Sequence, residues 1–299
     1  MQTTPRANTQ RILQGSATPV ARGVLRDQDG EPGVASGTIT ADIVDLDGVV
    51  SGTAGRAATH DTDIDMYTVA LTTAEAASLA VWRVDWKEDA VLRTSTWHRI
   101  VGGFLFSRGE LRDMKGIPAN LPDVQVDLAR EWITTLIEHQ TGAAWSPRHD
   151  VDVWVARDTA SYRASSGRYG VSGDRHVTEF RPVRTVQSIT IDGTAAALGD
   201  VTTDLDAGVI YGLHYYRACS VAYDHGYDTP TEPLRRAGLI AAQDLLLRGG
   251  SGLSERTRTQ TNDLGITQTF SFPGLNHPTG IDFVDAAILD ADQRLPGIA

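Results

Sequence analysis

The chain has 299 residues, of which 41% are hydrophobic and 22% charged, as in an ordinary globular protein of one or two domains. Its formal net charge of −11 argues against a protein that binds nucleic acid through a basic surface. The charge does not argue against a channel through which DNA passes without binding. The N-terminus lacks the apolar core of a signal peptide, and no run approaches the roughly 18 apolar residues of a membrane span. We therefore expect a soluble protein, made in a cytoplasm, with no membrane partner.

Residues 19–92, after an N-terminal arm at 1–18, have the pattern of a small β-sandwich. Short alternating runs rich in Val, Ile, Thr, Tyr and Trp are separated by Gly- and Asp-rich turns. Their even spacing predicts an immunoglobulin-like fold. The runs are "VARGVLRD", "SGTITADIVD", "DMYTVALT" and "LAVWRVDW".

Helical patterns begin after connecting strands at residues 93–106. Ser107 and Glu110 have the spacing of a capping box, which predicts a short helix. A long helix is predicted next, with Pro122 in its first turn and Gly142 as its stop. Its apolar residues predict one broad buried face: Val124, Leu128, Ala129, Trp132, Ile133, Leu136 and Ile137.

The rest of the chain returns to β structure and then to helix. Alternating runs predict a β insertion at about 150–223, in which the single cysteine, Cys219, is expected to be a buried, inert thiol. Thr229 is predicted to cap the next helix, with Asp228 as a second capping candidate. An extended polar hairpin at about 252–272 and a C-terminal helix at about 280–295 follow. The predicted fold class is α+β: an N-terminal immunoglobulin-like β-sandwich followed by a helical domain, 107–299, with the β insertion.

Two acidic clusters are candidates for metal or acid–base chemistry. "YDHGYD" contains Asp224, His225 and Asp228, but it lies where a strand gives way to a helix, and it lacks a further ligand at helical or hairpin spacing. "HDTDID", residues 60–65, begins like a calcium loop but continues with Met66 where that loop needs Gly. Since nucleophile-elbow, metalloprotease and phosphate-loop motifs are also missing, we expect no catalytic residue, no metal and no cofactor.

Four segments occur in an order that resembles a known family. They are "REWITTLIEHQTGAAWSPR", "VRTVQSITIDG", "YDHGYDTPTEPLRRAGLIAAQDLL" and "HPTGIDFVDAAILD". Together they resemble the head-to-tail adaptor proteins of long-tailed phages, particularly those of actinobacterial hosts. The resemblance covers residues 104–295, about two-thirds of the chain. The N-terminal sandwich is an addition to the minimal adaptor.

The resemblance implies a small helical bundle with a β insertion, and a virion protein of the head–tail neck without catalytic residues. It implies a dodecameric ring beneath the portal protein, extending a channel that DNA crosses without sequence-specific binding, and contacting the next neck or tail-completion protein. By analogy, the polar hairpin lines the channel or reaches a neighbouring ring, and the last helix and tail reach the portal. The implied hairpin residues are Arg256, Arg258, Gln260, Asn262, Asp263 and Gln268, and the implied portal residues are Asp285, Asp292, Arg294, Leu295 and Ile298.

Two other functions are open at this stage. A carbohydrate- or receptor-binding tail component would use the sandwich, and would show aromatic side chains on its loops. A metal-dependent hydrolase would use Asp224, His225 and Asp228.

Overall fold

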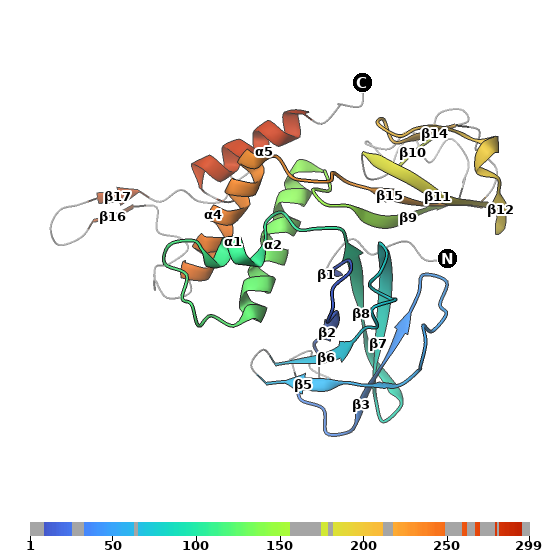
Figure 1. The fold of residues 1–299 in the computed structure, drawn as a ribbon, viewed down its shortest axis with the longest axis horizontal. Helices are drawn as coiled ribbons and strands as arrows, with labels where there is room; N and C mark the ends of the chain where they lie inside the picture. Colours follow the sequence, from blue (N-terminus) through green and yellow to red (C-terminus); the bar gives the residue numbers. More distant parts are fainter. Residues whose placement is uncertain are drawn as a thin grey trace. The chain divides into compact units, whose positions relative to one another are not determined.

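A computed structural model gives the fold, and it describes most of the chain (Figure 1). The architecture is mixed α+β, which confirms the predicted fold class with its β-sandwich and small helical part. The chain forms two compact units, Met1–Gly103 with Ser146–Asp228 and Phe104–Trp145 with Thr229–Ala299. The described residues are 9–25, 33–62, 65–155, 175–178, 182–211, 218–248, 259–261, 267–269, 279 and 281–294.

The N-terminal part of the first unit is a β-sandwich. One three-stranded sheet has the order β2-β6-β5, and the other sheet contains β1, β8, β7, β3 and β4. Strands β2 and β6 of the first sheet and β1, β8, β7 and β3 of the second supply residues of one shared core. Gln10 joins β1 to β2, because its side chain accepts from Arg22 N–H at 2.8 Å and donates to the Val20 carbonyl. The strands are β1 (Thr9–Leu13), β2 (Val20–Gly23), β3 (Ile39–Val44), β4 (Arg56–Ala57), β5 (Thr59–Asp61), β6 (Met66–Ala70), β7 (Ala80–Glu88) and β8 (Val91–Val101).

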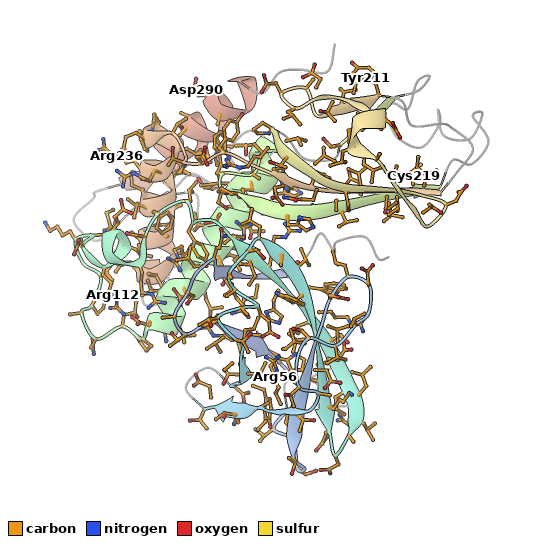
Figure 2. The ribbon with its side chains drawn as sticks, turned by 45° about the vertical axis from the view of Figure 1, so that its right-hand side comes forward. Arg56, Arg112, Tyr211, Cys219, Arg236 and Asp290 are labelled. Atoms are coloured by element: carbon orange, nitrogen blue, oxygen red, sulfur yellow. The ribbon has the colours of Figure 1, made fainter. Side chains whose placement is uncertain are left out.

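An ion pair stabilises one end of the sandwich. The Arg56 guanidinium donates two hydrogen bonds, of 2.6 and 2.8 Å, to the Glu75 carboxylate (Figure 2 labels Arg56). Burial alone would raise the pKa of Glu75, but these bonds and those from Ser51 and Thr72 lower it to about 2. The paired, hydrogen-bonded geometry is what lets a carboxylate with so little exposure stay ionised.

The β insertion continues the same sheet as β7 and β8. Its strands run in the order β12-β11-β15-β9, and β9 reaches β8 through Val101 and Arg148. Cys219 is buried in β15, as predicted. A smaller sheet, β10-β14-β13, contributes Ile210 to the core around Val221 and Tyr223. The strands are β9 (Arg148–Val155), β10 (Arg175–Val177), β11 (Val183–Ile191), β12 (Thr194–Ala196), β13 (Thr202–Asp204), β14 (Val209–Tyr211) and β15 (Ala218–His225).

The second unit contains the helices, and two predicted helix signals are confirmed. Ser107 and Glu110 form a reciprocal capping box at α1. Gly142 ends α2 with a left-handed φ of 67°, a conformation in which a side chain would be strained. Strands β16 and β17 pair antiparallel within the range predicted for the polar hairpin. The elements are α1 (Arg108–Arg112), α2 (Asp123–Thr141), α4 (Glu232–Arg248), β16 (Thr259–Thr261), β17 (Thr267–Thr269) and α5 (Asp282–Arg294).

The predicted start of α4 is wrong by two residues. The helix begins at Glu232 rather than at Pro230, directly after a Thr229 cap, and the Arg235 N–H donates to the Thr231 carbonyl. Pro233 then lies in the first turn, where the missing N–H would have had no helical partner. Asp228 does not reach this helix: its carboxylate pairs with Arg184 of β11 at 2.6 Å.

Candidate interaction surface

Helix α2 carries an apolar stripe on the side opposite its buried face. Ala129, Ile133 and Ile137 are buried in the second unit, whereas Leu128 is 38% exposed and Trp132 is 56% exposed. Residues four apart lie one above the other on a helix, so Leu128 and Trp132 form one continuous patch, which we call the α2 stripe. A tryptophan that keeps more than half of its surface in water is unusual for a side chain so costly to hydrate.

The sequence pattern assigned these two residues to the core, and that was wrong. The apolar residues of α2 cover a wider arc than the arc that its neighbours α1, α4 and α5 bury, so Leu128 and Trp132 stay exposed. The signal was present in the sequence as two apolar rows, one through Ala129 and Ile133 and the other through Leu128 and Trp132. Burial of a single helix face explains why one of these rows is apolar, but it does not explain the other.

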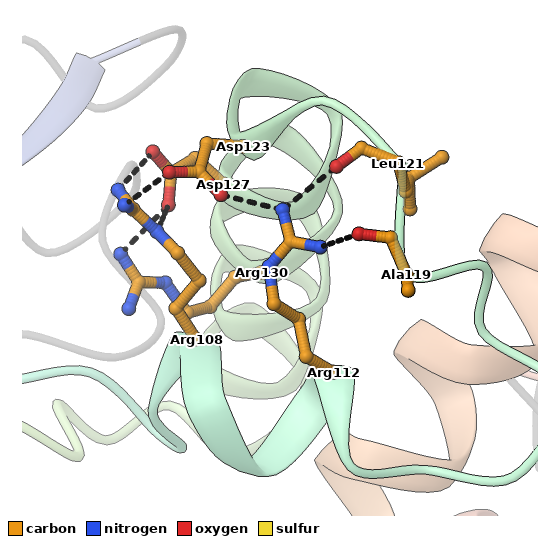
Figure 3. A network of polar contacts seen from close by, with 7 residues as sticks. All are labelled: Arg108, Arg112, Ala119, Leu121, Asp123, Asp127 and Arg130. Carbon is orange, nitrogen blue, oxygen red and sulfur yellow. Dashed lines mark hydrogen bonds and ion pairs between the residues drawn. The ribbon is translucent and has the colours of Figure 1, made fainter.

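A charge network holds the first turns of α2 against α1 (Figure 3). Arg108 clamps the buried carboxylate of Asp127 with two bonds, of 2.7 and 3.1 Å, and also reaches Asp123. Arg112 bonds the other Asp123 oxygen at 2.5 Å and the Leu121 carbonyl at 2.7 Å. A bidentate arginine fixes geometry as well as charge, so the network sets the orientation of the turn that carries Leu128.

Arg130 completes this network between the two rows. It donates to Asp127 at 3.1 Å, and its guanidinium lies 3.7 Å from the centroid of the Phe104 ring. Burial lowers the pKa of Arg130, and the charge of Asp127 opposes that change. The α2 stripe therefore lies on a helix that Asp127 and Arg130 hold to its neighbours through buried polar contacts.

The other helices also present apolar side chains to water. Leu247 of α4 is 43% exposed, and Phe283 and Leu289 of α5 are 44% and 43% exposed. Arg236 of α4 lies 5.5 Å above the Phe283 ring. The second unit thus has apolar residues on the outer sides of several helices, which is the kind of surface that marks association when it is contiguous.

The implied hairpin residues are only partly placed. The register of β16 and β17 sets Gln260 directly opposite Gln268. Arg256, Arg258, Asn262 and Asp263 lie outside the described residues, so their assignment to a channel or neighbouring ring stays a prediction.

Of the implied portal residues, Asp285 is the one whose side chain is described. It is 1% exposed, and one carboxylate oxygen accepts from the Thr279 N–H at 2.9 Å and from its hydroxyl at 2.7 Å. Thr279 in turn accepts from Ile281 N–H, so this cluster fixes the entry to α5. Asp292 and Arg294 lie in α5 without described side chains, and Leu295 and Ile298 lie outside the described residues.

The acidic clusters are engaged in structural contacts. Asp224 bonds His149 at 2.8 Å and Gln187 at 2.7 Å, whereas the neighbouring His225 faces the other way and bonds Asp150 at 2.6 Å. His60 pairs with Asp65 across the exposed turn. No group of three potential ligands positioned to hold a metal ion is found in the part of the chain that the structure describes. In the same residues, no helix combines the length and apolar character needed to cross a membrane.

Comparison with known proteins gives a distant structural likeness only. No family model matches the sequence, and no curated protein does. One solved structure that is similar, "Neck of empty GTA particle computed with C6 symmetry", has 19% identity and a TM-score of 0.38, covering 50% of this chain and 82% of that one. A second, "Virion of native gene transfer agent (GTA) particle", has 18% identity and a TM-score of 0.38 with the same coverage. These TM-scores are too low to support an argument about function.

Proposed function

We propose that this chain is a structural protein of a phage-like head–tail neck, an adaptor whose copies associate through the helical unit into a ring beneath the portal. The ordered motifs between residues 104 and 295 support the adaptor assignment. The observation that carries the association is the α2 stripe, because Leu128 and Trp132 are exposed on a helix that is otherwise firmly held.

A ring needs two different surfaces on each subunit, one for each neighbour. The α2 stripe supplies one apolar surface, and Phe283 and Leu289 of α5 supply a second on another helix. Burying a large aromatic side chain in a packed contact is the commonest source of strong binding energy at interfaces. Trp132 is therefore the proposed anchor between copies.

The channel and portal contacts follow from the same proposal. The hairpin residues around Gln260 and Gln268 would face the channel or the adjoining ring, and the end of α5 with Asp292 and Arg294 would face the portal. Asp285 is left out of this set, since its carboxylate is used within the subunit. A net charge of −11 suits a conduit that repels phosphate rather than binding it.

Nothing in the described sandwich favours the receptor-binding alternative. Trp86 and Tyr67 are buried, and Trp82 packs against the core with its indole N–H donating to the Glu75 carbonyl. These aromatic side chains lie on strands rather than on loops.

Electron microscopy of the purified protein mixed with portal rings tests the proposal. We expect closed rings stacked on portals, and we expect Leu128→Ser combined with Trp132→Ser to abolish them while the melting temperature stays within a few degrees of wild type. Leu198→Ser is the matched control, because Leu198 is 45% exposed in the first unit and outside the stripe. Rings that persist in the double variant would refute the role of the stripe, and bare portals with the wild-type protein would refute the adaptor.

A further inference from the structure

Very little main-chain pairing joins the sandwich to the β insertion. Strand β9 meets β8 at a single residue pair, Val101 with Arg148. Beyond it, Gly102 N–H donates to the Pro147 carbonyl at 2.7 Å. A Cβ on Gly102 would lie 2.9 Å from the Pro147 Cβ, so the two segments approach as closely as glycine allows. Two such contacts are a weak backbone connection between sheets of this size.

One buried carboxylate spans this junction. Asp150 of β9 is 1% exposed, and its two oxygens bind different strands. Oδ1 accepts from Arg99 of β8 at 2.8 Å, and Oδ2 bonds the ring Nε2 of His225 of β15 at 2.6 Å. The Asp150 carboxylate therefore connects β8, β9 and β15 at the place where β8 and β9 share a single backbone pair.

The surroundings of Asp150 make this tie difficult to break. Arg99 and His225 are both buried, with 7% and 0% exposure. Burial alone would raise the pKa of Asp150, but the charge of Arg99 and the His225 bond hold it well below its ordinary value. A buried charge that loses a partner is strongly destabilised, because water is not there to replace the lost interaction. Opening the junction would leave Arg99 and Asp150 in that state or force water in.

We propose that Asp150 fastens the N-terminal sandwich to the β insertion, so that strands β1 to β8 and strands β9, β11 and β15 move as one rigid body. The sandwich is then a fixed extension of the insertion rather than a tethered accessory domain. A load or displacement at the sandwich would pass directly to β9 and β15. This inference does not depend on the proposed adaptor function.

Asp224 provides a matched control within the same pair of strands. Its carboxylate also accepts from a histidine across β9 and β15, at 2.8 Å from His149, and it also has a lowered pKa. It differs in that His149 and Gln187, which bond this carboxylate, both belong to the insertion. Removing its charge should disturb β15 without loosening β8 from β9.

Distance measurements between two spin labels on the full chain test this proposal. Labels are placed at Arg93→Cys in β8 and Ser188→Cys in β11, both exposed, in a Cys219→Ala background. We expect one narrow distance distribution, unchanged by Asp224→Asn and clearly broadened by Asp150→Asn. Hydrogen exchange of the Gly102 amide, which donates to the Pro147 carbonyl across the junction, should accelerate at least about tenfold in Asp150→Asn and not in Asp224→Asn.

Each outcome decides the proposal. A broad distribution in the parent protein would overturn it, as would an Asp150→Asn protein that keeps the narrow distance and slow exchange. If Asp150→Asn does not fold, Arg99→Gln takes its place, because it removes the β8 arm, which crosses the junction, and leaves the bond with His225. Broadening in that variant supports the proposal, and an unchanged distance overturns it.

Discussion

Gly23 lies directly against the indole of Trp86: a Cβ on Gly23 would be 2.4 Å from Cε2 and 2.5 Å from Nε1. Trp86 is fully buried at the centre of the sandwich, and its indole N–H donates to the Thr96 hydroxyl at 2.8 Å. Gly23 belongs to β2 and Trp86 to β7, which lie in different sheets. The absence of a side chain at Gly23 therefore sets how closely the two sheets approach around the largest residue of the core.

Gly23→Ala should destabilise the sandwich by about 1–3 kcal/mol, the usual cost of adding volume to a packed core. The indole cannot move aside without losing its bond to Thr96. Urea unfolding followed by tryptophan fluorescence measures the change. Gly199→Ala is the control, since a Cβ there meets no atom within 4 Å, and it should leave the midpoint unchanged or slightly raised. Equal midpoints for the two variants would contradict the packing argument.

Ala90→Gly should stabilise the protein by about 0.5–1 kcal/mol. Asp89 and Ala90 form the two-residue turn between β7 and β8, and both have positive φ, 47° and 69°. This turn geometry favours glycine, because the alanine Cβ is crowded in the left-handed region. Thermal unfolding measures the gain. Ala195→Gly in the exposed strand β12 should instead lower stability, and a loss in both variants would show that Ala90 is unstrained.

Acid should weaken the sandwich through His98. This side chain is fully buried, and burial lowers its pKa to about 3. An unfolded histidine titrates near pH 6.5, so the unfolded state binds the proton first and stability falls as pH drops below that value. Between pH 7 and pH 5 the loss from this residue is about 2 kcal/mol.

The contribution of His98 to this loss of stability can be isolated by comparing the wild type with a His98 variant. His98→Gln should unfold more easily at pH 7 but lose about 2 kcal/mol less than the wild type on going to pH 5. His225, whose pKa burial also lowers, contributes in the same direction and is present in both proteins. If the unfolding free energies of wild type and variant fell in parallel with pH, protonation of His98 would cost the folded state little free energy, and the prediction would be wrong.

Asp285→Asn should lower the stability of the helical unit by about 1–3 kcal/mol, because it weakens an acceptor for two donors of Thr279 in a buried site. Asp282→Asn, in the exposed first turn of the same helix, should lower the stability by only a few tenths of a kcal/mol, which is about the size expected for one charge interacting with the helix dipole. Circular dichroism during heating compares the two. A stable Asp285→Asn protein that fails to join portals would instead support a contact role.

Local signals predicted several elements because their physics is local. The capping box at Ser107 and Glu110, the stop at Gly142 and the pairing of the polar hairpin depend on residues a few positions apart. The alternating runs likewise predicted a β-sandwich. The helix that follows the insertion was predicted, but its first residue was not, since Thr229, Thr231 and two prolines offer competing starts.

Long-range partners were outside the reach of the sequence pattern. Nothing in "YDHGYD" indicates that His225 turns inward to Asp150 while Asp224 turns to His149, because adjacent residues of a strand face opposite sides and their partners lie 75 positions away.

The sequence by itself determined the fold class and two helix caps, at Ser107 and Gly142, since periodicity and turn chemistry act over a few residues. The tertiary structure alone decided which apolar row of α2 is buried and which remains outside with Trp132. It also decided that Asp150 joins three strands and that Gly23 sets the spacing around Trp86. These three features depend on which segments, distant in the sequence, pack together and on how closely they approach. A local sequence pattern does not carry that information.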